Sequence, residues 1–320
     1  MSHFREYLLS LSSVWGQNPM RFPHPLACCP THRSWNPRTE APGPQVCPDV
    51  SLGCPPGSHD TMTYCLNKKS PISHNESRLL QLLGKILPCV TLPVVLRWST
   101  TQVLNVTEQL DAGVRYLDLR IAHVAEGSRR NLHFVHMVYT TALVEDTLTE
   151  ISEWLENHPR EVVVLACRDF EGVTEDLHEY LVACIKNVFG DMLCPRGVSM
   201  VTPSLRGSGE IRESEADTGR HREGWPRGRD CGHQPPPLSV PGGLFVAGIN
   251  LTENLEYVLG HLAGSLERMT LPSLPYLDAW VRAQCPGPGA RCTNIIAGDF
   301  IGADTFVSDV IRLNEKLLQG

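Results

Sequence analysis

The sequence predicts an α/β protein with a parallel sheet, organised as a TIM-like (β/α) barrel that is incomplete or distorted in its middle. Short apolar runs typical of buried strands alternate with longer amphipathic runs typical of helices, and this alternation indicates a parallel sheet covered by helices. Residues 199–240 contain neither kind of run, although a complete barrel needs further strands there.

The first elements follow one another closely. Residues 78–87 carry apolar side chains at helical spacing, and residues 104–113 predict a helix that a glycine ends, because glycine accepts the left-handed conformation. Residues 114–121 alternate apolar and polar side chains, as a strand with one buried face does. Residues 132–136 predict a second short strand.

The alternation continues to the end of the chain. Residues 143–156 predict an amphipathic helix, and residues 161–167 form an apolar run of the buried parallel type. Residues 174–189 predict the next helix, with Thr174 as its N-cap. The remaining predicted elements are strands at 243–249 and 294–300 and helices at 274–284 and 306–318.

Two segments differ in composition from the rest. Residues 1–55 are dense in proline, which blocks helices and central strands, so we expect an irregular N-terminal segment. Residues 199–240 mix arginines, acidic residues and three consecutive prolines, a composition typical of a disordered linker. We therefore assign residues 56–320 to one domain that this stretch interrupts.

Composition restricts the possible partners and location. The net charge of -7 argues against a nucleic-acid binder and gives no sign of a strong basic surface for anionic membranes, although a local patch could be hidden in the average. We predict no transmembrane segment, because no run of 18 apolar residues occurs. Without the pattern of a signal peptide, we expect a cytoplasmic protein with peripheral membrane contact and reduced cysteines; a secreted disulfide-rich protein is the alternative.

Four places put polar side chains at the ends of apolar runs. They are Gly57-Ser58-His59-Asp60, Asp118-Leu119-Arg120, His133-Phe134-Val135-His136 and Asp299. Taken singly, these are a turn, an ion pair, an ordinary histidine and a loop cap. Taken together, they form a set for acid–base chemistry at phosphate: one histidine takes a proton, the other gives one, carboxylates orient the rings, and the guanidinium binds non-bridging oxygens.

The same segments resemble a known family. Residues 57–64, 113–120 and 134–139 resemble, in order and spacing, three segments of the X-box of the phosphatidylinositol-specific phospholipases C, especially the stand-alone X-domain proteins of animals. The resemblance covers about residues 56–198 and 241–318. It implies a (β/α) barrel and a phosphoric diester hydrolase acting on an inositol phospholipid at a membrane surface.

The resemblance also implies catalytic roles. His59 would take the proton of the inositol 2-hydroxyl and would be oriented by Asp299. His136 would protonate the diacylglycerol oxygen and would be oriented by Asp60. The products would be diacylglycerol and a cyclic inositol phosphate or its hydrolysed form.

Three further residues belong to the implied site. Arg120 would hold the phosphate and Asp118 would help to order it, while Arg168 falls where bacterial members place a substrate-binding lysine. Arg120 stands at this position as in the metal-independent bacterial members, and a guanidinium would compete with calcium for it. We therefore predict no metal and no cofactor.

The sequence departs from the family pattern at several places. Met137 stands where a glycine usually follows the histidine, residues 49–56 form a poor lead-in strand, and residues 199–240 lack the mid-barrel strands. These departures indicate a variant of the family with an altered N-terminus and middle. They leave open the alternative of a catalytically silent module that binds phosphoinositides or a protein partner.

Overall fold

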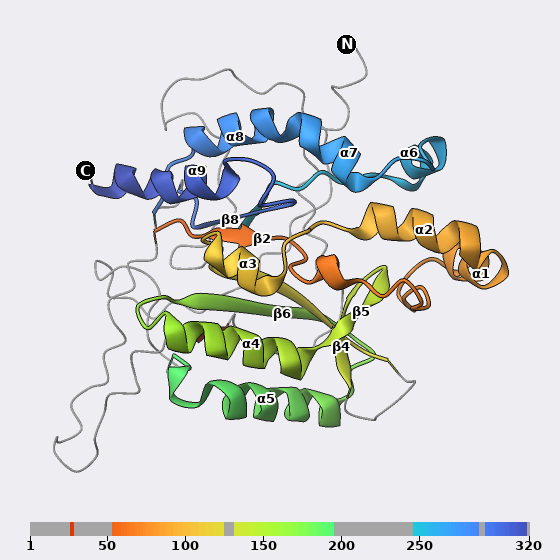
Figure 1. The fold of residues 1–320 in the computed structure, drawn as a ribbon, viewed down its shortest axis with the longest axis horizontal. Helices are drawn as coiled ribbons and strands as arrows, with labels where there is room; N and C mark the ends of the chain where they lie inside the picture. The colour runs from red at the N-terminus through yellow and green to blue at the C-terminus, as the bar shows by residue number, and fades with distance from the viewer. Residues whose placement is uncertain (1–25, 29–52, 125–130, 195–245, 288–291, 319–320) are drawn as a thin grey trace.

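The computed structural model describes residues 26–28, 53–124, 131–194, 246–287 and 292–318 (Figure 1). The strands are β1 (Leu26–Cys28), β2 (Pro56–Ser58), β3 (Tyr116–His123), β4 (Leu132–His136), β5 (Val138–Leu143), β6 (Val163–Glu171), β7 (Val246–Gly248) and β8 (Ile295–Gly298). The helices are α1 (Arg78–Ile86), α2 (Pro88–Ser99), α3 (Val106–Asp111), α4 (Val144–Asn157), α5 (Glu175–Phe189), α6 (Leu255–Gly260), α7 (Leu266–Thr270), α8 (Leu274–Ala283) and α9 (Phe306–Leu313).

The central part of the sheet is parallel, as the sequence predicts. Its strands run in the order β1-β6-β3-β2-β8-β7, and all five strands from β6 to β7 are mutually parallel. The described part of the sheet does not close on itself, so the fold is a distorted barrel. The predicted disordered stretch at 199–240 lies outside the described residues.

The structure adds antiparallel pairings that the sequence does not predict. β1 lies in the N-terminal segment predicted to be irregular and pairs antiparallel with β6, which supplies partners for its extended backbone. β4 forms as predicted, but it pairs antiparallel with β3 and turns back at once as β5. Only Met137 separates β4 from β5, and a parallel neighbour would need a crossover of a dozen or more residues.

The helices cover both sides of the sheet, with α4 and α5 on one side and α8 and α9 on the other (Figure 1). In α4, Leu148, Ile151 and Leu155 recur at helical spacing and are fully buried in the main core. α5 begins after Thr174, as predicted, but the Thr174 side chain makes no capping hydrogen bond. These helices hold the strand ends that carry the polar residues.

The helix before β3 is fixed at both ends. The Asn105 side chain accepts a hydrogen bond from the backbone N–H of Glu108 at 2.8 Å, and the Glu108 carboxylate accepts one from the Asn105 N–H at 2.8 Å. This capping box satisfies two donors that the start of a helix leaves free. At the other end, Gly113 has φ +109°, a conformation that disfavours any side chain. The sharp turn directs the chain into β3.

Helices α1 and α2 form a hairpin that projects from one end of the sheet (Figure 1). The sequence does not predict α2, because proline stands at both 88 and 93. Pro88 occupies the first turn, where its missing N–H costs nothing, and Pro93 lies inside the helix. Across the described ranges, no helix combines the length and apolar character needed to cross a bilayer.

The described cysteines only partly match the expectation of reduced thiols. Cys285 takes part in a disulfide. Thiols are found at Cys54, Cys65, Cys89, Cys167, Cys184 and Cys292.

Candidate active site

Strand register brings three predicted site residues to one level. Ser58 at the end of β2 is paired with Leu117 of β3 and with Gly298 of β8. The next residue of each strand is therefore His59, Asp118 or Asp299. Three polar side chains consequently gather at one level of the parallel sheet, with His59 and Asp299 directly after β2 and β8 and Asp118 within β3.

The backbone around this point is held tightly. A Cβ at Gly57 would lie 2.8 Å from Cδ1 of the Tyr116 ring, so only glycine fits there without a shift. The buried Gln102 amide donates to the carbonyls of His59 and Gly298 at 2.9 and 2.8 Å. These hydrogen bonds link the ends of β2 and β8 and fix the backbone position of His59.

His59 lies between two carboxylates and a guanidinium. Its Nδ1 is 2.8 Å from Oδ1 of Asp299, as predicted, and its Nε2 is 2.9 Å from Nη2 of Arg120 and 3.2 Å from Oδ2 of Asp60. Burial lowers the pKa of His59, but the charges of Asp60 and Asp299 and the Asp299 hydrogen bond outweigh burial and raise the pKa to about 9. A neutral ring accepts from Arg120 at Nε2, whereas a protonated ring donates to Asp60.

His136 is held differently from the arrangement that the family resemblance implies. Its Nδ1 donates to the backbone carbonyl of Ser99, the last residue of α2, at 2.6 Å. Asp60 instead faces Nε2, with Oδ2 at 3.4 Å. The main-chain carbonyl therefore sets the orientation of the ring, and Asp60 faces the nitrogen that would exchange a proton. Sequence patterns could not identify Ser99, because a backbone carbonyl has no residue signature.

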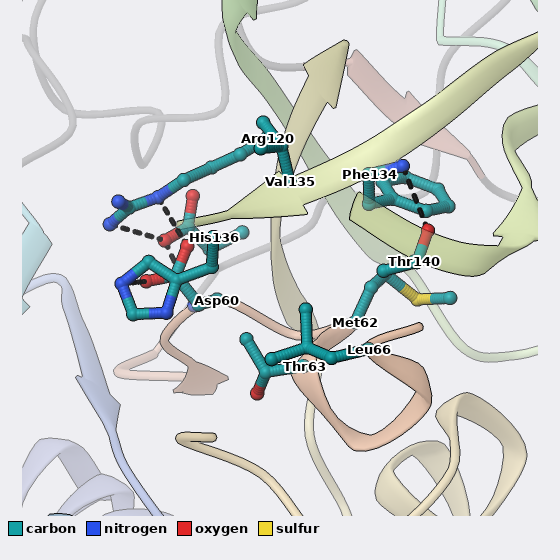
Figure 2. A pocket seen from close by; sticks show the side chains of 10 residues that line it. Asp60, Met62, Thr63, Leu66, Arg120, Phe134, Val135, His136 and Thr140 are labelled. Atoms are coloured by element: carbon teal, nitrogen blue, oxygen red, sulfur yellow. Dashed lines mark hydrogen bonds and ion pairs between the residues drawn. The ribbon is translucent and has the colours of Figure 1, made fainter. Parts of the chain in front are cut away.

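Asp60 is the centre of the cluster. Its side chain is almost fully buried, Oδ1 forms an ion pair with Nε of Arg120, and Oδ2 lies between the Nε2 atoms of the two histidines. Figure 2 shows Arg120 and His136 converging on this carboxylate. The His59 and His136 rings stand edge to face with centroids 6.4 Å apart. One carboxylate thus links both imidazoles and the guanidinium.

Asp118 and Arg168 support this centre. Arg168 donates to Asp118 through both Nε and Nη2, and Asp118 also accepts the backbone N–H of Asp60 at 3.0 Å. Burial raises the pKa of Asp118, but Arg168 and Arg120 outweigh burial and hold the pKa well below its usual range. In this arrangement Arg168 is hydrogen-bonded to Asp118, and its predicted role in binding substrate phosphate stays a prediction.

Two further carboxylates lie close by and escaped the sequence analysis. Oδ2 of Asp169 is 3.5 Å from Nε of Arg120, and burial raises the pKa of Asp169 despite the neighbouring arginines. Glu253 follows β7, and burial, together with the charge of Asp299, raises its pKa to about 7. The position of Asp169 directly after a strand-end arginine is a signal that could have found it, whereas Glu253 follows no strong pattern.

A shared backbone feature marks the ends of the site strands. The non-glycine residues with positive φ are Asp60 (44°), Met137 (60°), Asp169 (68°), Phe170 (45°) and Phe300 (51°) among those described. Four of these residues directly follow a predicted site residue: His59, His136, Arg168 and Asp299. Left-handed backbone is unfavourable for side-chain-bearing residues and is concentrated at functional sites in proteins.

The cluster also contains possible metal ligands. His59, Asp60 and Asp118 offer ligand atoms that lie within 4.8 Å of one another. Arg120 and Arg168 already neutralise these carboxylates, so a cation would have to displace or repel them. The absence of a required metal therefore stays a prediction, which chelation can test.

A small pocket adjoins the cluster. Asp60, Arg120 and His136 form its polar side, and Met62 and Leu66 lie on its apolar side (Figure 2). His133 does not line the pocket. Its Nδ1 is 3.0 Å from the Thr140 carbonyl, so the ring makes a local structural contact. Of the two histidines on β4, only His136 faces the cluster.

Known proteins resemble this chain over most of its length. The family model PI-PLC X 1 matches residues 94–182. PI-PLC X domain-containing protein 1 of Homo sapiens is 69% identical over 287 residues, which cover 82% of this chain and 87% of the relative. The protein of the same name from Mus musculus is 57% identical, with 86% of each chain covered.

A solved structure shows the same fold at lower sequence identity. A mutant of the phosphatidylinositol-specific phospholipase C from Staphylococcus aureus superposes with a TM-score of 0.50 at 15% identity, and the match covers 82% of this chain and 93% of that one. The resemblance inferred from the three sequence segments is confirmed by the relatives. The chain belongs to the family of PI-PLC X domain-containing proteins.

Proposed function

We propose that the chain is a phosphoric diester hydrolase that cleaves an inositol phospholipid by general acid–base catalysis with two histidines and no required metal. The observation that supports this most is the placement of both Nε2 atoms on the same Asp60 oxygen, at 3.2 Å for His59 and 3.4 Å for His136. Two imidazoles on one carboxylate, with a guanidinium on its other oxygen, can exchange protons on both sides of a phosphate.

The proposed reaction uses each group once. His59 removes the proton of the inositol 2-hydroxyl as that oxygen attacks phosphorus. The bond from phosphorus to the glycerol oxygen breaks, and His136 gives its Nε2 proton to the leaving oxygen. Arg120 turns its donors to the non-bridging oxygens, where negative charge builds in the transition state. The products are diacylglycerol and a cyclic inositol phosphate.

The protonation of His59 gives this proposal a pH dependence. A general base must be neutral, and the two carboxylates raise the pKa of His59 to about 9 in the substrate-free protein. The rate depends on the product of the neutral fraction of His59 and the protonated fraction of His136. We expect kcat/KM to fall on the acid side of its pH profile because the neutral fraction of His59 falls there, and to fall on the alkaline side because His136 must keep its proton. A kcat/KM that shows no fall on the acid side of the profile would contradict the role of His59 as base.

The first test is turnover of phosphatidylinositol and of a soluble inositol phosphodiester. The wild type is measured with EDTA and with calcium, beside His59→Ala, His136→Ala and the matched control His133→Ala. We expect turnover that survives EDTA, falls at least about a hundredfold in the His59 and His136 variants, and persists in the control. Turnover that EDTA abolishes, or that survives both substitutions, overturns the proposed mechanism.

One observation favours the alternative of a silent binding module. Both guanidiniums of the cluster are already engaged by carboxylates, Arg120 by Asp60 and Arg168 by Asp118. If substrate phosphate cannot displace Asp60 from Arg120, the pocket could recognise a headgroup without cleaving it. A cooperatively melting protein that binds inositol phosphates but shows no turnover would support this reading.

A further inference from the structure

The α1–α2 hairpin carries an apolar face with no partner among the described residues. The side chains at 79, 82, 83 and 86 recur at i, i+3, i+4 and i+7 on one side of α1, and none of the side chains of α1 is buried. We call the outer hairpin face the set Leu79, Leu82, Leu83, Ile86, Leu87 and Val90, whose exposed fractions are 61, 52, 37, 63, 50 and 58%. Soluble proteins seldom expose a contiguous apolar patch of this kind without a use for it.

The inner side of the hairpin is well packed. Val95 of α2 forms a small core with Ile72 and with Val138 of β5, and Leu80 of α1 and Met137 pack against that core. The exposure of the outer hairpin face therefore does not come from a loosely attached segment. One side of the hairpin packs against the rest of the fold, and the other side is exposed to solvent.

The hairpin is joined directly to the candidate general acid. Ser99, the last residue of α2, holds Nδ1 of His136 through its carbonyl at 2.6 Å. Just before α1, the side chain of the buried Glu171 at the end of β6 accepts hydrogen bonds from Ser73 Oγ at 2.5 Å and His74 N at 3.0 Å. Both ends of the hairpin are thus anchored beside the site.

The charge around the hairpin differs in sign from that of the whole chain. Residues 68–90 contain four basic side chains and one acidic, Glu76, whereas the net charge of the chain is -7. The basic side chains are Lys68, Lys69, Arg78 and Lys85, and all are exposed. An apolar helix face flanked by basic residues is the composition of helices that lie in an anionic lipid surface.

We propose that the outer hairpin face docks into an anionic phospholipid surface and so delivers the cluster around His136 to a membrane. A lipid surface is the occupant that fits both the apolar face and the surrounding positive charge. The choice of lipid over a protein partner rests in part on the proposed function, because a phosphatidylinositol substrate is itself an anionic membrane lipid. The structure assigns this contact to α1 and α2, away from α8 and α9.

The test is flotation of the full-length chain with vesicles of phosphatidylcholine, with and without phosphatidylinositol. The variant Leu82→Gln/Ile86→Gln removes two exposed apolar groups, and Tyr276→Gln on α8, which is 59% exposed, is the matched control. We expect the double variant to bind phosphatidylinositol vesicles at least about tenfold more weakly, because two side chains no longer leave water. We expect the control to bind like the wild type and all three proteins to melt alike.

The outcomes separate this inference from the proposed function. Undiminished vesicle binding by the double variant overturns the docking face, whatever the activity. A double variant that changes from a dimer to a monomer without lipid shows that a second copy occupies the face, and this also overturns the proposal. Turnover of a soluble inositol phosphodiester tests the chemistry alone. An inactive wild type whose vesicle binding depends on Leu82 and Ile86 refutes the proposed function and leaves the docking face standing.

Discussion

Asp118→Asn should destabilise the fold far more than the loss of one surface charge. The carboxylate is buried and accepts two hydrogen bonds from Arg168 and one from the Asp60 N–H. Removing one member of a buried ion pair leaves the other uncompensated, at a cost of about 3–5 kcal/mol. The Arg168 side chain keeps a 26% exposure that partly screens it, so we expect a cost near the lower figure, about 3 kcal/mol.

The assay is thermal and urea unfolding of Asp118→Asn beside Glu161→Gln. Glu161 pairs with Arg115 at 2.8 Å but is 42% exposed, so its substitution should cost about 0–1 kcal/mol. For a domain of this size we expect Tm to fall by about 6–12 °C in the Asp118 variant. Equal effects of the two substitutions, or a loss under about 1 kcal/mol at Asp118, would refute the assignment of Asp118 as the buried support of the site.

The same variant has a pH signature. The pKa of Asp118 is lowered in the folded protein, so its contribution to stability is present above the ordinary carboxyl pKa of about 4 and is lost as pH falls through the folded value. The difference in unfolding free energy between wild type and Asp118→Asn should therefore be constant from pH 5 to 7 and shrink below pH about 4. A difference that instead grows in acid contradicts the sign of this linkage.

Substitutions at three other positions test separate features. Met137→Val places a β-branched side chain at φ +60° and should lower the free energy of unfolding in urea by about 1–3 kcal/mol. Met137→Gly should change it by less than about 1 kcal/mol, because relief of backbone strain offsets the lost packing. Equal costs for the two variants would argue against backbone strain at this position. Asp299→Asn removes a charge and a hydrogen bond that raise the pKa of His59. An NMR titration of the variant should therefore give a His59 pKa well below about 9. A His59 pKa that stays near 9 would show that Asp299 is not the cause of the raised value. The raised pKa stabilises wild type fully below about 6.5 and ceases to do so as pH rises through about 9, so the variant should lose less stability across that window. Glu171→Gln weakens its bonds to Tyr139 Oη and its other donors and should cost about 2 kcal/mol, read by urea unfolding against Glu161→Gln as an exposed control.

The sequence predicts the regular part of the fold well. Helix α4 and strands β3 and β8 form within two residues of their predicted ends, because burial on one face imposes a period that the sequence records. The antiparallel return at β5 and helix α2 are not predicted. The turn at Met137 consists of one residue and contains no glycine that would indicate a turn in the sequence. In α2, tertiary packing outweighs the two prolines that disfavour a helix.

The sequence predicts which residues form the site better than it predicts the hydrogen bonds between them. The register of adjacent parallel strands brings His59, Asp118 and Asp299 together, and that follows from the parallel sheet. The partner of His136 does not follow, because a main-chain carbonyl can lie anywhere in the sequence. The engagement of Arg168 by Asp118 depends on the register between β3 and β6, which short-range patterns do not determine.

The left-handed residues after the site strands have a consequence for protein engineering. Copying His59, His136, Arg168 and Asp299 onto the regular strand ends of an idealised barrel would not reproduce the course of the chain after them, because each is followed here by a residue with positive φ. A designer would first have to build a residue with positive φ into the backbone after each of the four site residues. Glycine adopts that conformation without penalty and is the natural choice at the positions of Met137 and Phe300, whereas the position of Asp60 must keep its carboxylate. The transferable unit is therefore a residue pair, a functional side chain and the backbone bend behind it.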